Sequence, residues 1–591
     1  MHDVGLRRSK HRESAVGEVE AWIEVKVAGA RILTSEELAR YAARSPVCGW
    51  RIPITLRIGR RFLDLIILPE FPRMAPRVAL VEVGMDPNAT PHVEEDGVLC
   101  LLDDMSSVAD DDPLRVTQHV LESAQSLLER FSGGDVDAEF RREYLTYWAR
   151  DSSKGAAPVF SLLRAAEGTR GIVAWAGRNI VLVAENEEDA DHWLRHRFRD
   201  LDEKLVFVAG ALFWMNQELV PSEFPRSRQQ VLALSDGDRV GRRSLMEAAK
   251  ACPSELFIVL GCNSGDAVCF TSVSLRRPPH LGHGFRPGER WRKFFAFGSA
   301  PARRHVLRID GPWIHGRGKD ERHSRLAKTS VIIIGCGSVG APTAIALANA
   351  GVGSLTLIDP QVLESANVGR HPLGVADVGS YKSKALRNRL LSKLPHMTDV
   401  VEHHEGWQEI FSKNPRLFES ADLVLSATGV WAEEGALNEW HVGSGRKIPV
   451  LYGWTEAHAV AGHAVVIKGS GGCLRCGTNS VGVRRFRVSD WPDGLERLKA
   501  EPGCGGLFQP YGPVELMSTI GLVAEMALDA LLDDGQSKSS FHRVWSAREA
   551  RIREFGGSWT SDWRKTVGDN ERGSQTRELE WEARSTCREC Q

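Results

Sequence analysis

Apolar and polar residues alternate in the first quarter of the chain in a way that predicts a small sheet followed by helices. The alternation predicts three strands in meander order, at residues 51–58, 61–68 and 77–83, with prolines between them. Apolar residues then recur at helical spacing over 116–131, and a second helix is expected over 138–150. A sheet that precedes its helices is typical of an α+β domain.

The remaining chain divides into a middle region and a long C-terminal region. Residues 160–275 alternate short apolar strands with helical stretches and carry no motif with recognisable chemistry, so we expect an α/β scaffold or docking domain. From about residue 320 a regular βαβ rhythm begins, with a strand at 331–335 and a helix at 341–351. This rhythm predicts an α/β doubly wound parallel sheet, and the predicted fold class is therefore multidomain.

Composition restricts the class of protein. The chain has 591 residues, too many for one core, and its 42% hydrophobic and 26% charged residues are those of a soluble globular protein. A net charge of −2 argues against general binding of nucleic acid or membrane surfaces. The N-terminus lacks the apolar core of a secretory signal, and no apolar run reaches the ~18–20 residues of a membrane span. We expect a cytoplasmic protein.

A glycine-rich loop marks a candidate nucleotide site. Gly335, Gly337 and Gly340 follow a predicted strand and open a helix, where glycines permit a tight turn and the helix N-terminus favours phosphate. Asp359 ends the next strand, where a carboxylate can bind a ribose hydroxyl. These residues alone fit a nicotinamide-dependent dehydrogenase and an ATP-dependent enzyme equally well.

The residues that follow separate these two classes. Asn367 and Arg370 in an Asn-x-x-Arg motif, and Lys382 in a Gly-x-x-Lys motif, resemble the ThiF/MoeB-like family of adenylating enzymes, which includes ubiquitin-activating enzymes. The resemblance implies that ATP and magnesium are cofactors and that these three residues handle the triphosphate. Fixed cations can offset the negative charge that builds as a carboxylate attacks the α-phosphate.

One position departs from that family. Many members continue the strand at 421–428 with an aspartate that assists magnesium, whereas this sequence has Gly429. Three explanations remain open: another carboxylate contributes, magnesium is held mainly by ATP, or the activity is impaired. The candidate carboxylates are Asp422, Glu433 and Glu434.

Two CxxC pairs predict a structural metal. Cys473 and Cys476 form the first pair, and Cys587 and Cys590 form the second. Four thiolates in two such pairs suit tetrahedral zinc with no open position, which would hold the C-terminal tail on the adenylation domain. The alternative is that one pair is redox-active.

Two further cysteines are candidate nucleophiles. Cys504 lies in a Gly- and Pro-rich loop before a predicted helix, and its surroundings resemble the family pattern in which a cysteine forms a thioester with the activated protein. Cys100 ends the stretch GVLC, which is similar to the ubiquitin-conjugating fold. His92 stands where conjugating enzymes have asparagine, and its imidazole could donate the same hydrogen bond or deprotonate an attacking amine. Either cysteine could instead be structural.

Taken together, the chain resembles the fused conjugating–activating proteins of bacterial antiphage (CBASS-type) operons. The resemblance implies ATP-dependent adenylation of a partner protein's C-terminus, relay from Cys504 to Cys100, and ligation to a target amine. It also implies a cGAS-like nucleotidyltransferase as the partner and a homodimer, without membrane or nucleic-acid partners. The alternatives are a nicotinamide-dependent dehydrogenase and a non-catalytic scaffold of decayed domains.

The expected domain division follows from these motifs. It comprises a ubiquitin-conjugating-like domain (1–155), a middle scaffold domain (156–275), a linker (276–315) and a ThiF-type adenylation domain (316–591). Residues 276–305 carry eight basic residues and one acidic residue among prolines and glycines, as a solvated linker does. RNA binding through the Phe and Trp residues of this stretch is the alternative.

Overall fold

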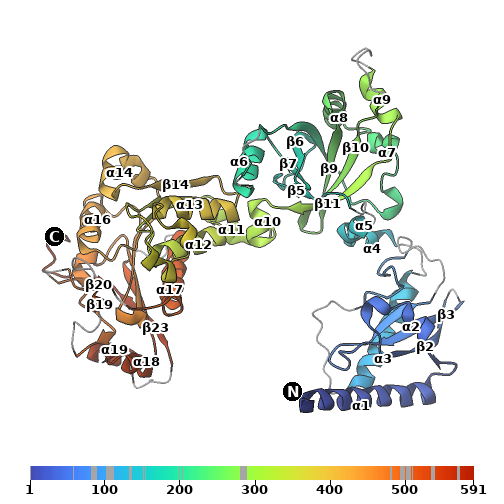
Figure 1. The fold of residues 1–591 in the computed structure, drawn as a ribbon, viewed down its shortest axis with the longest axis horizontal. Coiled ribbons are helices and arrows are strands. Elements are labelled where there is room, and N and C mark those ends of the chain that lie inside the picture. The colour runs from blue at the N-terminus through green and yellow to red at the C-terminus, as the bar shows by residue number, and fades with distance from the viewer. Residues whose placement is uncertain are drawn as a thin grey trace. The chain divides into compact units, whose positions relative to one another are not determined.

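The computed structural model divides into two compact units. Figure 1 labels its helices and strands along the chain. The structure describes residues 2–57, 59–81, 90–101, 112–131, 136–150, 152, 155–198, 200–201, 204–279, 289–479, 482–492, 499–500, 507–508, 510–533, 539–568 and 573–590. Unit 1 comprises residues 1–159, 165–171 and 208–306, and unit 2 comprises 160–164, 172–207 and 307–591.

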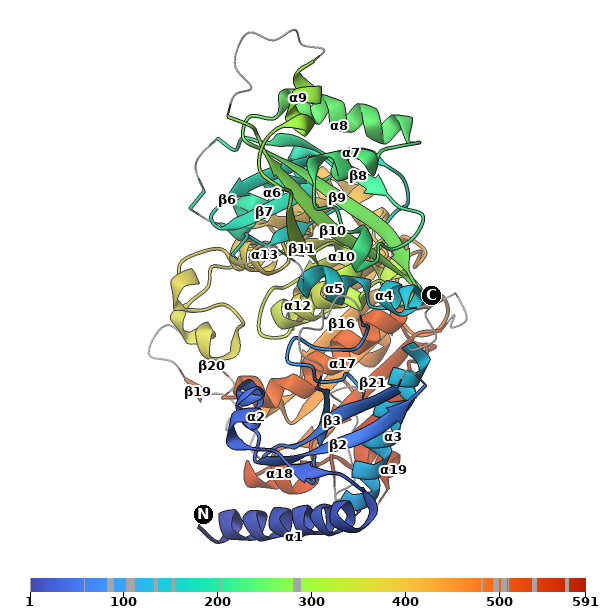
Figure 2. The ribbon, with the colours of Figure 1, turned by 90° about the vertical axis from the view of Figure 1, so that its right-hand side faces the viewer.

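Unit 1 begins with a four-stranded antiparallel meander. Its strands, in sheet order, are β1 (Arg31–Ile32), β2 (Cys48–Leu56), β3 (Gly59–Ile67) and β4 (Arg77–Leu80). Figures 1 and 2 show α1 (His2–Lys26) and α3 (Pro113–Phe131) beside this sheet, and both helices share its apolar core. The three predicted strands and the first predicted helix are confirmed. Helix α1 was not predicted, because its core residues Ala15, Val19 and Ile23 are few and widely spaced.

The second helix expected in this region is divided in two. Helix α4 (Asp137–Arg142) and helix α5 (Tyr144–Arg150) are separated at Glu143. Phe140, Tyr147 and Trp148 of these helices are buried among residues of the middle region. The break between the helices thus lets aromatic side chains from both of them pack in the same core.

Further strands of unit 1 build the middle region. Strand β8 (Val208–Trp214) runs parallel to β9 (Glu255–Ser264), which forms an antiparallel hairpin with β10 (Ala267–Arg276). Helices α7 (Arg228–Ala233) and α8 (Arg239–Ala251) lie between β8 and β9 in the chain. The range expected as a linker, 276–315, contains α9 (Arg290–Ala296), α10 (Gly311–Gly316) and β11 (Ala302–Arg308), and β11 pairs antiparallel with β10.

Unit 2 contains a short β-hairpin with a helix and a large sheet. Strands β6 (Arg170–Gly177) and β7 (Ile180–Ala184) pair antiparallel and precede α6 (Glu187–Arg197). The His192 side chain of α6 lies 2.9 Å from the carbonyl oxygen of Met397, so this helix contacts the chain that leads out of α13 (Lys382–Lys393).

The large sheet of unit 2 has eight strands. In sheet order they are β14 (Asp399–His403), β13 (Ser354–Ile358), β12 (Ser330–Ile334), β15 (Leu423–Ser426), β16 (Val450–Thr455), β17 (Ala461–Ile467), β21 (Phe541–Ser546) and β23 (Gln575–Glu580). The first five are parallel, and the last three extend the sheet antiparallel.

Helices cover both faces of this sheet, which confirms the doubly wound prediction. Val331 and Ile333 of β12 pack with α12 (Gly340–Ala350), α13 and α17 (Pro513–Leu532), whereas Ile332 and Ile334 pack with α14 (Trp407–Lys413) and α16 (Trp431–Gly443). A parallel strand that is buried on both faces does not alternate between polar and apolar residues. This explains why residues 331–334 of β12 form one continuous apolar run. Among the helices that the structure describes, none has the length and hydropathy needed to cross a bilayer.

Candidate functional site

A cavity of about 300 Å³ lies at the carboxyl ends of the central parallel strands of unit 2. It is lined by Ile334, Gly335, Gly337, Ile358, Asp359, Pro360, Gln361, Gly406, Trp407, Ala427, Thr428, Val430 and Glu433. Gly335 has φ of +90°, and a Cβ on Gly340 would lie 1.9 Å from the carbonyl oxygen of Gly335. Two of the three predicted glycines therefore line the cavity, and the third allows α12 to approach the loop.

Asp359 organises the loop as well as the cavity. Its carboxylate accepts hydrogen bonds from the backbone N–H of Cys336 at 2.7 Å and from that of Gln361 at 2.8 Å. The residue is 5% exposed and lines the cavity. A carboxylate has about four acceptor positions, so Asp359 can accept a hydroxyl as well as these two N–H groups.

Lys382 lies next to the cavity through Gln361. Its Nζ donates a hydrogen bond to Oε1 of Gln361 at 2.7 Å, and the residue is 7% exposed at the first position of α13. Arg370 lies over the ring of Tyr511 at 5.6 Å, and the Asn367 side chain accepts a hydrogen bond from its own turn. None of these three predicted residues is among the described cavity-lining residues.

The structure separates the three candidate carboxylates. Glu433 lines the cavity, and its Oε2 accepts a hydrogen bond from Gln408 at 2.9 Å. Asp422 accepts from the backbone N–H of Ser330 at 2.7 Å, at the opposite end of β12 from the glycine loop. Glu434 is 1% exposed and is paired with Arg484. Glu433 is thus the one of the three that faces the nucleotide cavity.

A second cavity, of about 530 Å³, surrounds Cys100 in unit 1. It is lined by His92, Cys100, Leu101, His119, Glu122, Ser123, Ser126, Leu127, Arg130, Glu139 and Arg142. Cys100 is exposed, and its backbone N–H donates to the carbonyl of His92 at 2.8 Å. The fold therefore brings the two predicted residues to one cavity, although eight positions separate them.

Two carboxylates orient the imidazole of His92. Its Nε2 lies 3.3 Å from Glu139, its Nδ1 lies 3.3 Å from Glu143, and its ring stacks on Phe131 with centroids 5.9 Å apart. Burial opposes ionisation of Glu139, but the hydrogen bond with His92 and the charge of Arg142 outweigh it and lower its pKa. Sequence patterns carried no signal for either glutamate, because only the packing of the tertiary structure brings Glu139 of α4 and Glu143, at the break between α4 and α5, next to His92.

The four cysteines of the CxxC pairs converge in unit 2. Their sulfur atoms all lie within 4.8 Å of one another, and Cys473 to Cys587 is 3.6 Å and Cys476 to Cys590 is 3.5 Å. Four sulfurs around zinc, with Zn–S of about 2.3 Å, lie roughly 3.8 Å apart, so this set fits the metal. Arg446 donates a hydrogen bond to Cys590 at 3.2 Å, which suits a thiolate. Cys504, the other predicted thiol of this region, lies outside the described residues.

Family comparison assigns both regions that carry these sites. Residues 316–532 match the ThiF family, and residues 26–156 match Prokaryotic E2 family B. The chain joins a ThiF domain to a prokaryotic E2 domain. The predicted combination of an activating-type and a conjugating-type domain is therefore confirmed.

Individual relatives agree with this combination. The ATP-dependent ubiquitin transferase-like protein Cap2 of Pseudomonas aeruginosa is 26% identical over 77% of this chain and 82% of its own length. The probable adenylyltransferase/sulfurtransferase MoeZ of Mycobacterium tuberculosis is 34% identical, over 24% of this chain and 35% of its own. Solved Escherichia coli MccB with MccA-N7isoASN is 16% identical and covers 54% of this chain and 77% of that chain, at a TM-score of 0.31 that supports no further argument. The matched family and these relatives support an enzyme of the ubiquitin-activating-like adenylyltransferase kind.

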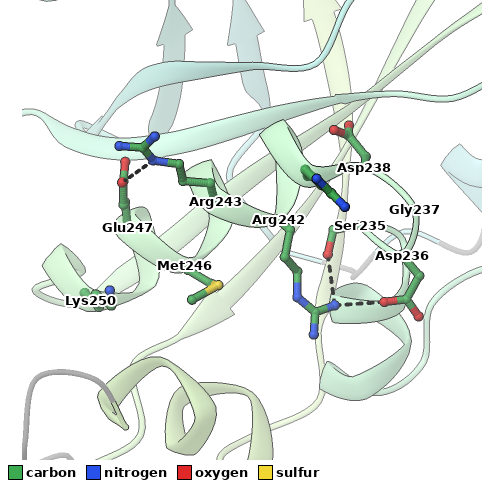
Figure 3. A pocket seen from close by; sticks show the side chains of 10 residues that line it. Ser235, Asp236, Gly237, Asp238, Arg242, Arg243, Met246, Glu247 and Lys250 are labelled. Atoms are coloured by element: carbon green, nitrogen blue, oxygen red, sulfur yellow. Dashed lines mark hydrogen bonds and ion pairs between the residues drawn. The ribbon is translucent and has the colours of Figure 1, made fainter.

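A third cavity, of about 500 Å³, lies outside both of these domains, along α8 of the middle region (Figure 3). Two of its arginines bond to other lining residues: Arg242 bonds to Asp236 and Ser235, and Arg243 bonds to Glu247. The described lining residues include neither cysteine nor histidine. Among its described lining residues this cavity therefore lacks the thiol and imidazole groups that line the Cys100 cavity.

The nucleotide cavity of the ThiF domain includes an aromatic residue that sequence patterns did not reveal. Trp407, at the start of α14, is 5% exposed and lines the nucleotide cavity. Its indole N–H is buried without a hydrogen-bond partner in the described part of the chain. A buried unpaired donor is costly, so a ligand acceptor such as a purine ring nitrogen would suit this position.

Proposed function

We propose that this chain activates the C-terminal carboxylate of a partner protein with ATP and transfers it, through Cys504 and Cys100, to an amine of a target. The observation that supports this most is the cavity formed by the glycine loop and Asp359 in a chain that also places Cys100 and His92 at a cavity of the E2 domain. The first cavity suits a nucleotide and the second suits thiol chemistry.

In the adenylation step, a carboxylate oxygen of the partner attacks the α-phosphorus of ATP, and pyrophosphate leaves. Asp359 would bind the ribose, and Lys382 and Arg370 would offset the charge on the departing pyrophosphate. Magnesium would neutralise part of the triphosphate charge when bound. Glu433 is the carboxylate that we assign to assist it, since it faces the cavity.

In the transfer steps, the Cys504 thiolate attacks the acyl carbonyl of the adenylate and AMP leaves. The Cys100 thiolate then displaces Cys504 from the resulting thioester. Finally a target amine attacks the thioester on Cys100, loses a proton and releases the thiolate. His92, oriented by Glu139 and Glu143, would take that proton or hydrogen-bond to the developing oxyanion.

Fusion of the two domains has a physical advantage. Exchange between two thioesters is nearly isoenergetic, so its rate depends on how often the sulfurs meet and on the thiolate fraction. A covalent link between domains raises the effective concentration of one thiol near the other, commonly into the millimolar range for short linkers. We also propose a homodimer, in which the transfer runs either within one chain or between the two chains.

The biological setting is a further part of the proposal. Similarity to the ubiquitin transferase-like protein Cap2 supports the proposal that the substrate is a protein. We propose that this substrate is a cGAS-like nucleotidyltransferase encoded in an antiphage operon, and that the chain acts in the cytoplasm. We also propose zinc at the four clustered cysteines, in a structural role, because a closed four-sulfur site offers no position to substrate.

ATP–pyrophosphate exchange tests the activation step. The wild-type chain should exchange only when the partner's free C-terminus is present, and Lys382→Ala should lower the rate by at least about a hundredfold, since a fixed cation stabilises the charged transition state. Exchange at the wild-type rate in Lys382→Ala would refute the assignment of this site.

Non-reducing gels with ATP and the partner test the relay. Cys504→Ala should prevent loading of both thiols, whereas Cys100→Ala should leave a reductant-sensitive adduct on Cys504 and abolish ligation to amines. Cys252→Ser is a matched control, because Cys252 is a buried cysteine of the middle region. Full loading of Cys100 in the Cys504→Ala protein would show direct transfer from the adenylate and exclude the relay.

A further inference from the structure

Glu434 is a buried carboxylate beside the nucleotide cavity, and its two oxygens have different partners. One oxygen, Oε1, accepts a hydrogen bond from the backbone N–H of Gly429 at 3.2 Å. The other, Oε2, pairs with the guanidinium of Arg484. Gly429 has φ of +66° and lies between Thr428 and Val430, which both line the cavity. Glu434 therefore holds the centre of a turn that shapes the nucleotide site.

Arg484 belongs to a distant segment of the ThiF domain, residues 482–491. Its guanidinium lies 4.5 Å from the ring centroid of Trp454 and 5.8 Å from that of Trp431. A Cβ on Gly482 would lie 2.4 Å from Trp431, so the segment packs closely against the start of α16. Burial lowers the pKa of Arg484 and raises that of Glu434, and their mutual attraction opposes both shifts.

A second carboxylate, that of Glu456, whose side chain is 10% exposed, holds the other end of this segment. It accepts hydrogen bonds from the backbone N–H groups of Val488 at 2.7 Å and Ser489 at 2.8 Å. It also lies 2.9 Å from His463. Glu456 is not among the described residues that line the nucleotide cavity, and no described hydrogen bond joins it to the turn at 428–430. The segment thus has two similar attachments, of which only one reaches the nucleotide site.

We infer that Glu434 is a positioning residue for nucleotide binding, which holds the turn at 428–430 in its binding conformation and depends for its own position on Arg484. This inference rests on the proposed function. It makes segment 482–491, which carries Arg484, a determinant of nucleotide affinity. Stability alone does not explain the pair, since a buried ion pair is often no more stabilising than apolar residues of the same volume. The hydrogen bond from Gly429 to Glu434 connects the ion pair to the turn at 428–430.

The test compares three variants for nucleotide binding, measured calorimetrically with a non-hydrolysable ATP analogue, and for thermal stability. Glu434→Gln and Arg484→Met should each weaken nucleotide affinity about tenfold, a change equivalent to about 1.4 kcal/mol. They should raise KM for ATP in exchange assays and leave KM for the partner unchanged. Glu456→Gln should lower the unfolding temperature comparably but keep nucleotide affinity within about twofold of wild type.

The double variant adds an independent check. Because Glu434 and Arg484 act as one unit, Glu434→Gln combined with Arg484→Met should bind nucleotide no more weakly than the worse single variant. If Glu434→Gln does not fold, Arg484→Lys, which keeps the charge, should still weaken binding measurably. Wild-type affinity in folded Glu434→Gln, or an equal loss in Glu456→Gln, would overturn the inference. A wild-type chain that binds nucleotide but exchanges no pyrophosphate would refute the proposed function and leave this inference standing.

Discussion

The carboxylate of Asp359 accepts a hydrogen bond from the backbone N–H of Cys336 at 2.7 Å, although 23 positions separate the two residues. Asp359 directly follows β13, and Cys336 lies in the glycine loop after β12, the adjacent parallel strand. The residue expected to bind ribose therefore also fixes the loop expected to bind phosphate. One side chain thus supports both halves of the nucleotide site.

Asp359→Ala should abolish nucleotide binding and also destabilise the ThiF domain. The substitution removes the acceptor of the backbone N–H groups of Cys336 and Gln361. Cys336 is buried, and its unpaired N–H alone costs about 1–3 kcal/mol. Calorimetry with ATP and thermal unfolding would measure the two effects. Asp562→Ala is a suitable control, because that carboxylate lies on the exposed side of α19 (Ser561–Val567). Retained nucleotide affinity in Asp359→Ala would contradict the assigned role.

Glu433→Gln should raise the magnesium concentration needed for half-maximal pyrophosphate exchange about tenfold, because the amide keeps the shape but loses the charge that attracts the cation. Binding of Mn²⁺ in the presence of an ATP analogue, followed by electron paramagnetic resonance, gives a second readout that does not depend on turnover. Asp422→Asn should leave both unchanged, since Asp422 lies at the far end of its strand. Equal effects of the two substitutions would disprove the assignment to Glu433.

Purified chain should contain about one zinc ion, and Cys587→Ser should lose it and unfold at a lower temperature. Burial raises the pKa of Cys476 to about 11, so in metal-free protein this sulfur is a thiol, and binding of zinc would release its proton. Elemental analysis and thermal unfolding would measure content and stability. Cys252→Ser should keep its zinc, and metal-free protein from a chelator-free preparation would exclude the site.

Acid should destabilise unit 2 through His396. Burial, together with the neighbouring His315 and His323, lowers the pKa of His396 to about 4. The unfolded chain therefore binds more protons than the folded one between pH ~4 and ~6.5, so stability is complete above that range and falls within it, by up to about 3 kcal/mol. His396→Gln should flatten the fall in unfolding temperature with pH, whereas the exposed His305→Gln should not. An unchanged profile in His396→Gln would refute this.

The sequence by itself determined the features that depend on local pattern. The strand, glycine loop and helix from Ser330 to Ala350 are encoded by a run of apolar residues followed by closely spaced glycines, and the structure has them at those positions. The two CxxC pairs likewise indicated a joint site, because a metal ligand set is defined by residue type and short spacing. Patterns of this kind require no knowledge of distant neighbours.

Only the tertiary structure decided which of several similar residues faces which partner. Glu433 and Glu434 are adjacent in sequence, yet one lines the nucleotide cavity and the other is buried against Arg484, 50 positions away. Trp407 reaches the same cavity without any motif, and β11 joins a sheet from a stretch that reads as a linker. Consecutive helical positions point about 100° apart, so the packing of the helix, and not the residue type, determines the environment of each side chain.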